Sequence, residues 1–367
     1  MRYFGLINLF WSDWCDLHFR KVLDKVCHHA RKTKLVLLSA VSSLAAMVSC
    51  SSGTKPDFKN PDDAMREYHL FVEKLTASTD IGMSEFISSV CSWQEMSDKV
   101  FECLNADPSF AQNQKLYSDF TATNDSIRSR LGRMPSSMDL TFDDVVTIKE
   151  KTNSFRCDSS LVDIRAKLNE HCNRLMEITV QEQSKEKILT EYRNFLQEQK
   201  RDGIHSREKL LGFILIEDVL FRSFLAHLPE YTDSSLVDIT SDTEEICRQI
   251  FENVDAAELD PSETLAYMTA RTNRRLLLNA RTCINDIRKG KVGTDALMAV
   301  YQWMILQPIA TIEGFSLALM SEDQMSEFHQ IARDLSEILS STEGKLGGSY
   351  LREEMPRQIV KLYITSL

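Results

Sequence analysis

The sequence contains few of the residues that interrupt regular secondary structure. Glycine occurs 12 times and proline 8 times in 367 residues, and this glycine content is near half of the usual share of about 7%. Few turns imply long elements, and the polar positions are filled mainly by Glu, Gln, Lys, Arg, Ser and Asp, a composition that favours helices. No convincing run alternates apolar and polar residues, as a half-buried strand would. We therefore predict an all-α fold.

Signature motifs of common enzyme classes are missing as well. The sequence has no HExxH, no GxSxG, no Walker A motif and no CxxC, which argues against the zinc, serine-nucleophile, nucleotide and thiol-redox sites built on those spacings. The stretch from Gly290 to Thr294 shares letters with a phosphate-binding loop but lacks its order and a preceding strand, so we interpret it as a turn between helices. We predict no catalytic residue, no metal and no cofactor.

The first 49 residues have the layout of a secretory signal. A basic stretch from His28 to Lys34 precedes an uncharged run of 13 residues, Leu35 to Met47. This run is shorter than the roughly 20 residues that a membrane-spanning helix needs. The alternative is a short anchor that is never cleaved.

The residues at the end of that run resemble a known signal. Met47-Val48-Ser49-Cys50 is similar to the lipobox of bacterial lipoproteins, with Met47 where the usual pattern has Leu. The resemblance implies that Cys50 receives a diacylglycerol and becomes the first residue of the mature chain. The following residues, Ser51 to Pro56, are small, polar and rich in breakers, as a tether requires. We predict a leader and signal at 1–49, a tether at 50–60 and a helical domain at 61–367.

The formal charge expected for the mature chain limits the classes of partner that it can bind. Seven basic and three acidic residues lie in 1–49, so their removal lowers the formal charge from −11 to −15. Nucleic acid and anionic headgroups should repel so acidic a body. We expect the membrane to be contacted through the lipid, and another envelope protein or a glycan to be the partner.

Helix starts are marked by capping residues. An Asn or Asp precedes Pro at Asn60-Pro61, Asp107-Pro108 and Asp260-Pro261, and Ser321 with Gln324 forms a capping box. Gly132, Gly203, Gly290 and Gly344 lie where C-terminal caps belong. We predict a bundle or array of about twelve helices, at 61–77, 84–105, 108–131, 141–155, 160–181, 184–201, 206–228, 236–254, 261–289, 294–319, 322–341 and 349–365.

A short sequence occurs twice in the chain. The residues from Asp158 to Ile164 recur from Asp233 to Ile239 at an offset of 75, and Cys172 matches Cys247 in the same register. Duplication of a three-helix unit, spanning 158–232 and 233–307, would explain the recurrence. A shared capping sequence is the alternative.

The mature chain retains six cysteines besides Cys50. Disulfides and buried free thiols are both open interpretations, since an exported protein meets an oxidising compartment. The six are Cys91, Cys103, Cys157, Cys172, Cys247 and Cys283.

Four arginines form a candidate surface for an anionic partner. Arg271, Arg274, Arg281 and Arg288 recur near one face of the helix expected after Pro261. A basic stripe on an acidic protein attracts anions. The alternative is a solvated face whose arginines pair with carboxylates of the same chain.

These features indicate a lipid-anchored envelope protein, facing the periplasm from the outer membrane, that acts as a non-catalytic interaction or ligand-binding scaffold. The outer membrane is favoured because Ser51 follows Cys50, where an Asp marks inner-membrane retention in some lipoproteins. The alternative is a glycan-active hydrolase that uses two carboxylates from distant helices, because such a pair leaves no local motif.

Overall fold

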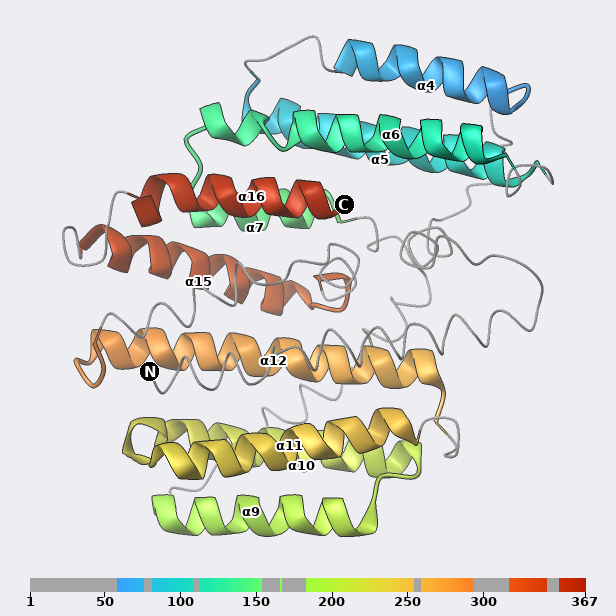
Figure 1. Ribbon diagram of the computed structural model, residues 1–367. Coiled ribbons are helices and arrows are strands. Elements are labelled where there is room, and N and C mark those ends of the chain that lie inside the picture. The colour runs from blue at the N-terminus through green and yellow to red at the C-terminus, as the bar shows by residue number, and fades with distance from the viewer. Residues whose placement is uncertain are drawn as a thin grey trace. The chain divides into compact units, whose positions relative to one another are not determined.

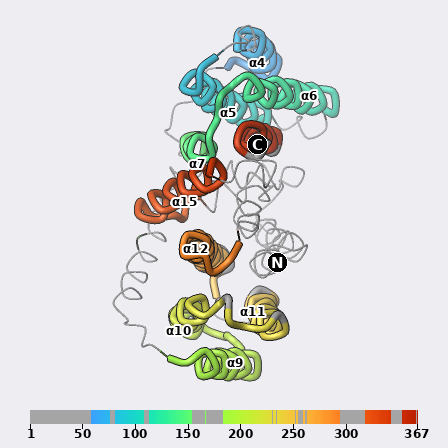
Figure 2. Tube along the Cα trace, turned by 90° about the vertical axis from the view of Figure 1, so that its left-hand side faces the viewer, coloured from blue at the N-terminus to red at the C-terminus, as the bar shows by residue number. Residues whose placement is uncertain are grey.

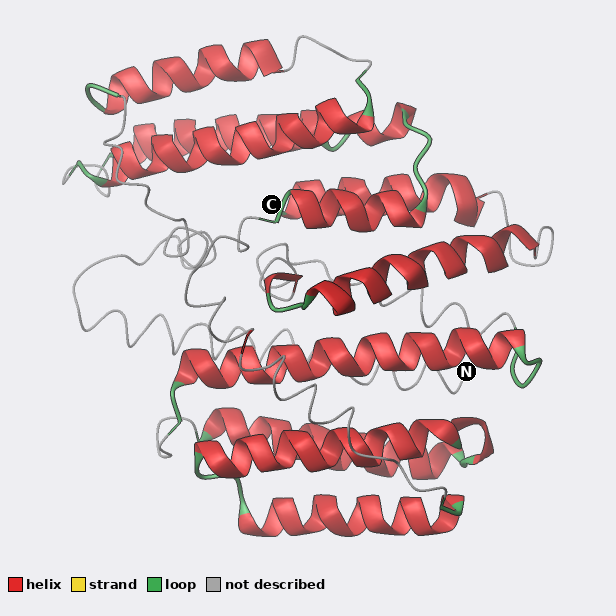
Figure 3. Cartoon of the chain, turned by 180° about the vertical axis from the view of Figure 1, so that it is seen from behind, coloured by secondary structure: helices red, strands yellow, loops and turns green. Residues whose placement is uncertain are grey.

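The computed structural model describes residues 58–75, 81–107, 113–153, 166, 183–253, 259–293, 317–341 and 350–367. Across these ranges the chain forms helices joined by loops and turns, and none of the described residues lies in a strand (Figure 3). The all-α prediction is confirmed for this part of the chain.

The described residues form ten α-helices, where about twelve were predicted (Figure 1). Two predicted ranges account for the difference: 160–181 lies outside the described residues apart from one position, and 294–319 lies outside them up to residue 316. The helices are α4 Pro61–Leu75, α5 Met83–Asn105, α6 Gln114–Leu131, α7 Phe142–Lys151, α9 Lys185–Asp202, α10 Arg207–Ala226, α11 Asp233–Glu252, α12 Pro261–Arg288, α15 Glu322–Ser341 and α16 Met355–Ser366.

Side-chain caps set several of the predicted starts. Asp260 Oδ1 accepts a hydrogen bond from the Glu263 amide at 2.8 Å, with Pro261 as the first helical residue. The Ser321–Gln324 capping box is present in both directions. Three starts differ from prediction by three residues or more. α6 begins at Gln114, capped by Asn113, and α11 begins at Asp233, because Thr232 already caps it. α16 begins at Met355, after a π-helical segment at Tyr350–Glu354. Local hydrogen bonds thus decide where the capped helices begin.

A glycine with positive φ follows two of the helices. Gly203 follows α9 and Gly290 follows α12, each with φ of 69°. Gly132 also lies at a helix end, but its φ of −67° is right-handed. There the reason for glycine is space, because a Cβ would lie 3.2 Å from Cγ2 of Thr365 in α16. Gly344 lies outside the described residues.

The chain divides into two compact units. Among the described residues, unit 1 contains α9, α10, α11, α12 and most of α15. Unit 2 contains α4, α5, α6, α7, the end of α15 and α16.

In unit 1, alternate helices run side by side. Arg193 of α9 pairs with Asp238 of α11, and Gln197 pairs with Asp242, both at a separation of 45 residues. A constant separation means that α9 and α11 run parallel and in register. α10 runs back between them in sequence, packs on α9 and contacts α12 (Figure 2).

In unit 2, the core contains a neutral hydrogen-bond network. The Asn124 side-chain oxygen accepts hydrogen bonds from Tyr68 Oη at 2.6 Å, Trp93 Nε1 at 3.1 Å and Ser97 Oγ at 3.1 Å. Tyr68 and Trp93 are buried, so these donors have little access to water. The network fastens α4, α5 and α6 to one another.

Four predicted features stay predictions, because residues on which they depend lie outside those that the structure describes: the signal, lipidation of Cys50, the tether and the duplication. The signal, Cys50 and the tether up to residue 57 lie outside the described residues, as does all but one residue of 154–182, where the first copy of the repeated sequence falls. The duplication therefore has one described opening helix, α11.

None of the described helices is both long and apolar enough to cross a bilayer.

Candidate functional site

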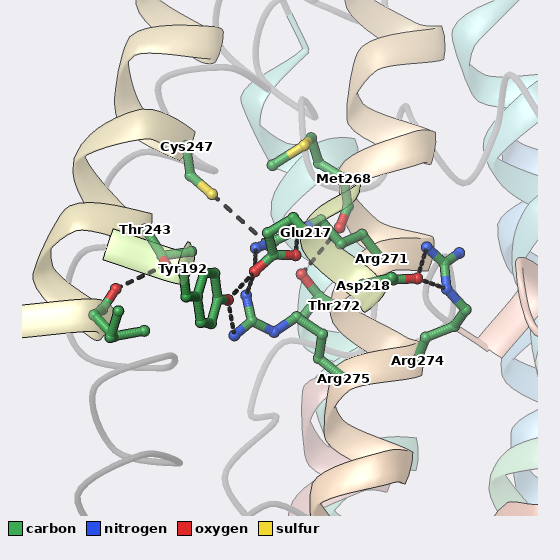
Figure 4. Close-up of polar contacts among 11 residues, drawn as sticks. Tyr192, Glu217, Asp218, Thr243, Cys247, Met268, Arg271, Thr272, Arg274 and Arg275 are labelled. Atoms are coloured by element: carbon green, nitrogen blue, oxygen red, sulfur yellow. Dashed lines mark hydrogen bonds and ion pairs between the residues drawn. The ribbon is translucent and has the colours of Figure 1, made fainter. Parts of the chain in front are cut away.

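Four helices of unit 1 contribute side chains to a charged cluster in the interior. α10 is apolar around most of its surface, as expected of a buried helix, yet it places Glu217 and Asp218 inside the unit. Across from them, α12 contributes Arg271, Arg274 and Arg275 (Figure 4). Tyr192 of α9 and Cys247 of α11 complete what we call the Glu217 cluster.

Three side chains of the described helices donate hydrogen bonds to the Glu217 carboxylate. Arg271 Nε donates to Oε2 at 3.0 Å, and Tyr192 Oη donates to Oε1 at 2.6 Å. Arg275 Nη1 also donates to Oε1. Glu217 has no exposed surface and Arg271 is 3% exposed, so the pairing takes place away from water.

The arginines determine the charge state of this carboxyl. Burial alone would raise the pKa of Glu217, but the Arg271 and Arg275 guanidiniums outweigh burial and hold that pKa below its usual value. The rings of Phe213 and Phe221 lie under Arg271 and Arg275 at 5.5 Å and 3.7 Å from the centroids. These contacts stabilise cations that have lost their water.

Tyr192 and Cys247 stay protonated beside this charge. Burial raises the pKa of Tyr192 and also the pKa of the Cys247 thiol. Arg271 Nη1 lies 3.8 Å from Cys247 Sγ. A buried thiol with a raised pKa is a poor nucleophile, so Cys247 acts as a packing residue.

A second pair lies next to the cluster on the same two helices. Arg274 Nε donates to Asp218 Oδ2 at 2.7 Å, and Arg274 Nη2 lies 2.6 Å from the same oxygen. The side chains are 14% and 10% exposed. The adjacent acids of α10 thus have different partners on α12: Glu217 pairs with Arg271 and Arg275, and Asp218 pairs with Arg274.

Farther along α12, arginines pair with α15. Arg281 binds Glu327 through Nε at 2.5 Å and Nη2 at 2.7 Å, and its Nη1 reaches Asp334 Oδ2 at 2.7 Å. Arg288 Nη2 donates to Asp334 Oδ1 at 3.1 Å. Burial opposes ionisation of Asp334, but hydrogen bonds from Gln330 and Arg288 keep its pKa below the usual value.

The four arginines of the predicted basic stripe are therefore all found in ion pairs with carboxylates of unit 1. Arg271 is buried and Arg274 is nearly so, whereas Arg281 and Arg288 are 25% and 41% exposed. The alternative interpretation expected this pairing, but it also expected a solvated face, and Arg271 and Arg274 do not lie on one. Binding of an anionic partner stays a prediction, and within the stripe Arg288 is the most exposed position.

The described histidines are scattered. His69 contacts Asp119 at 3.2 Å in unit 2, and His227 lies 3.1 Å from Glu230 and 3.2 Å from the Gln183 carbonyl in unit 1. Among the described residues, no group of three or more His, Cys, Asp or Glu side chains is arranged to hold a metal ion. His171 lies outside those residues.

Four of the six cysteines that follow Cys50 in the sequence are described, and none of these four forms a disulfide. Cys103, Cys247 and Cys283 are buried, and Cys91 is half-buried with its thiol donating to the Lys151 carbonyl. Cys157 and Cys172 lie outside the described residues. The interpretation as buried thiols is confirmed for Cys103, Cys247 and Cys283, whereas Cys91 is only half-buried.

Sequence reasoning missed Glu217, Tyr192 and Arg275 as members of one cluster. A signal for it exists: Glu217-Asp218 is an acidic pair within the apolar stretch from Leu210 to Ala226. Since buried carboxylates require partners, two adjacent acids on an apolar helix predict basic residues on a neighbouring one.

Comparison with protein-family models, with curated proteins and with solved structures finds no match to this chain.

Proposed function

We propose that this chain is a lipid-anchored envelope protein whose helical body is a non-catalytic interaction or ligand-binding scaffold. The lipid anchor rests on the lipobox pattern that ends at Cys50 and on the short polar tether after it. The scaffold function rests on the chemistry of the Glu217 cluster.

One observation argues most directly against catalysis at that cluster. Glu217 is wholly buried and its oxygens are occupied by Arg271, Arg275 and Tyr192. A general acid or base must reach the proton that it transfers, at about 2.6–3.2 Å or through one water. Glu217 is ionised, enclosed and fully engaged, so its role is to hold α9, α10 and α12 together.

The arrangement of unit 1 favours a binding body. Parallel, in-register α9 and α11 with α10 returning between them is the pattern of stacked helical hairpins, and such arrays offer long surfaces to partners. Ion pairs along the α9–α11 and α12–α15 contacts brace these surfaces. A braced helical surface suits recognition of another envelope protein or a glycan.

The anchor is tested by phase partition in a temperature-sensitive detergent, followed by mass spectrometry of the N-terminal peptide. Wild-type protein should enter the detergent phase with an acylated Cys50, and Cys50→Ala should remain aqueous. Cys91→Ala is the matched control, because Cys91 is a free thiol within the helical body, and it should partition like wild type. Firm membrane binding of Cys50→Ala would contradict the proposal.

The scaffold function is tested with the detergent-solubilised full chain. When this protein is incubated with envelope glycan fragments, it should bind them and change their electrophoretic mobility. It should not release new reducing ends from them. Release of reducing ends that is lost in carboxylate variants would instead establish the hydrolase alternative.

Accessibility to protease tests the predicted periplasmic facing. Protease added to intact cells should leave the protein whole, and permeabilised cells should lose it. Rapid digestion in intact cells would place it on the outer surface.

A further inference from the structure

Glu244 of α11 is a carboxyl group at the edge of the Glu217 cluster. Its Oε1 is buried and accepts no hydrogen bond within the described part of the chain. The residue lies one turn before Cys247, whose thiol contacts Arg271 of the cluster. A carboxylate oxygen removed from water without a donor is costly in its ionised form.

The basic side chains along α11 are committed to other carboxylates. Arg248, one turn after Glu244, binds Glu245 at 2.9 Å and Glu252 at 2.6 Å. Lys200 of α9, which packs on α11, donates to Asp242 at 2.8 Å. None of these cations pairs with Glu244 in the described residues.

On the cluster side of α11 the nearest charged groups are likewise engaged. Arg271 touches Cys247 Sγ at 3.8 Å, but it directs Nε to Glu217 at 3.0 Å. Arg275 donates to the same Glu217 carboxylate. Among the described residues, burial therefore acts on Glu244 without an opposing cation, and it raises the pKa of Glu244 to about 7.

We infer that Glu244 is a proton-binding position that couples the packing of α11 to pH. With the proton bound, α11 packs a neutral carboxyl group beside Cys247. When the proton leaves for water, α11 must hold a negative oxygen that has no donor, and its packing in unit 1 weakens. The inference is independent of the proposed function.

The direction of the effect follows from the two states of the chain. In the unfolded chain Glu244 titrates near its ordinary pKa of 4.5, and in the folded chain near 7. The folded state therefore binds the extra proton between these values, so the stability contributed is present below about pH 4.5 and lost as pH rises through about 7. This direction is opposite to that of carboxylates held by arginine.

The experiment compares wild type with Glu244→Gln and Glu245→Gln as full chains. Samples are equilibrated in urea at pH values from about 5 to about 8.5 and then given a brief pulse of hydrogen exchange at one fixed pH. Mass spectrometry of peptides from Asp233–Glu252 reports the unfolding of α11 alone. The readout is the change of the urea midpoint of α11 with pH. The midpoint at a single pH is not used, because the glutamine amide itself changes the stability of α11 by an amount that does not depend on pH.

The neighbouring residue supplies the control. Arg248 hydrogen bonds hold the pKa of Glu245 below its usual value, so Glu245 stays ionised throughout this pH range. Wild type and Glu245→Gln should lose α11 stability with the same slope, and Glu244→Gln should lose less. The difference in the unfolding equilibrium of α11 across the range should be on the order of 10-fold to 100-fold.

Equal slopes for wild type and Glu244→Gln would overturn the inference. Should Glu244→Gln fail to fold, carboxyl ¹³C signals of glutamate-labelled wild type decide the matter. One glutamate that titrates near pH 7 supports the inference, and the absence of any glutamate titrating above about pH 6 overturns it.

Discussion

The two units bury polar groups at comparable positions between helices, but with different chemistry. In unit 1 the central group is the ionised carboxylate of Glu217, enclosed by Arg271, Arg275 and Tyr192. In unit 2 it is the neutral amide oxygen of Asn124, which accepts from Tyr68, Trp93 and Ser97. Both acceptors are met by three side chains, so neither is left without partners.

The difference lies in what happens when the network is incomplete. A neutral group that loses its partner costs about 1–3 kcal/mol, whereas a buried ion that loses its partner costs about 3–5 kcal/mol. The ionic network also titrates, and the amide network does not. Unit 1 should therefore be more sensitive both to substitution and to pH than unit 2.

The largest expected effect is that of Glu217→Gln. Two buried guanidiniums would lose their counter-charge, and unit 1 should lose about 3–5 kcal/mol of unfolding free energy. The exposed pair Arg193–Asp238 provides the control, because Asp238→Asn should cost less than about 1 kcal/mol. Urea unfolding with peptide-resolved hydrogen exchange measures both. If both variants lost the same unfolding free energy, burial would not increase the contribution of the Glu217 ion pairs to stability.

The next effect concerns Asn124→Ala in unit 2. Tyr68, Trp93 and Ser97 would together lose their acceptor, and the expected loss is about 1–3 kcal/mol. Ser97→Ala removes one donor only and should cost about 0.5–1.5 kcal/mol. Urea unfolding with hydrogen exchange of peptides from α5 measures both losses, since Trp93 and Ser97 lie on that helix. A cost for Asn124→Ala equal to that of Glu217→Gln would remove the distinction between the units.

A glycine pair tests whether the helices of unit 1 depend on backbone conformation. Gly203 and Gly290 share a φ of 69°, but an added Cβ at Gly203 would lie 2.4 Å from the His205 ring, and at Gly290 nothing lies within 4 Å. Gly290→Ala should cost about 1 kcal/mol for conformation alone, and Gly203→Ala should cost more. Thermal unfolding monitored by circular dichroism ranks the two. The reverse ranking would show that the His205 ring moves aside freely.

The smallest expected effect is produced by mild acid. Because arginines hold the pKa of Glu217 below its ordinary value, its contribution is present above about pH 4.5 and lost as pH falls through its folded-state pKa. Asn124 has no proton to gain. Hydrogen exchange near pH 3, corrected for intrinsic rates, should show unit 1 loosening before unit 2. Simultaneous loosening would indicate that acid acts through groups other than the Glu217 cluster.

The local features of the fold could be predicted from short stretches of sequence. Asp260-Pro261 and the Ser321–Gln324 capping box mark helix starts that the structure has at those residues. The signals act within one helical turn, between a side chain and backbone amides three residues away, so neighbouring residues suffice. The same range explains the errors, because Asn113 and Thr232 are competing caps of the same kind.

The candidate site could be predicted only in part. The arginines of α12 stood out as a basic stripe, and the alternative interpretation foresaw that carboxylates would pair with them. It did not foresee which ones: Glu217 lies 54 residues from Arg271, and Asp334 lies 53 residues from Arg281. A helical period shows that residues share a face, but it does not identify the helix that packs against that face.

The sequence by itself determined that this chain is helical, where helices such as those at Pro261 and Glu322 begin, and that the chain is acidic, because propensity, capping and charge are properties of residues and their near neighbours. The tertiary structure decided which charges are buried and which partners neutralise them. Arg271 and Arg288 look alike in sequence, yet Arg271 is enclosed against Glu217 and Arg288 is 41% exposed beside Asp334. The cost of removing a charge from water depends on every helix around it, and so only the packed chain fixes it.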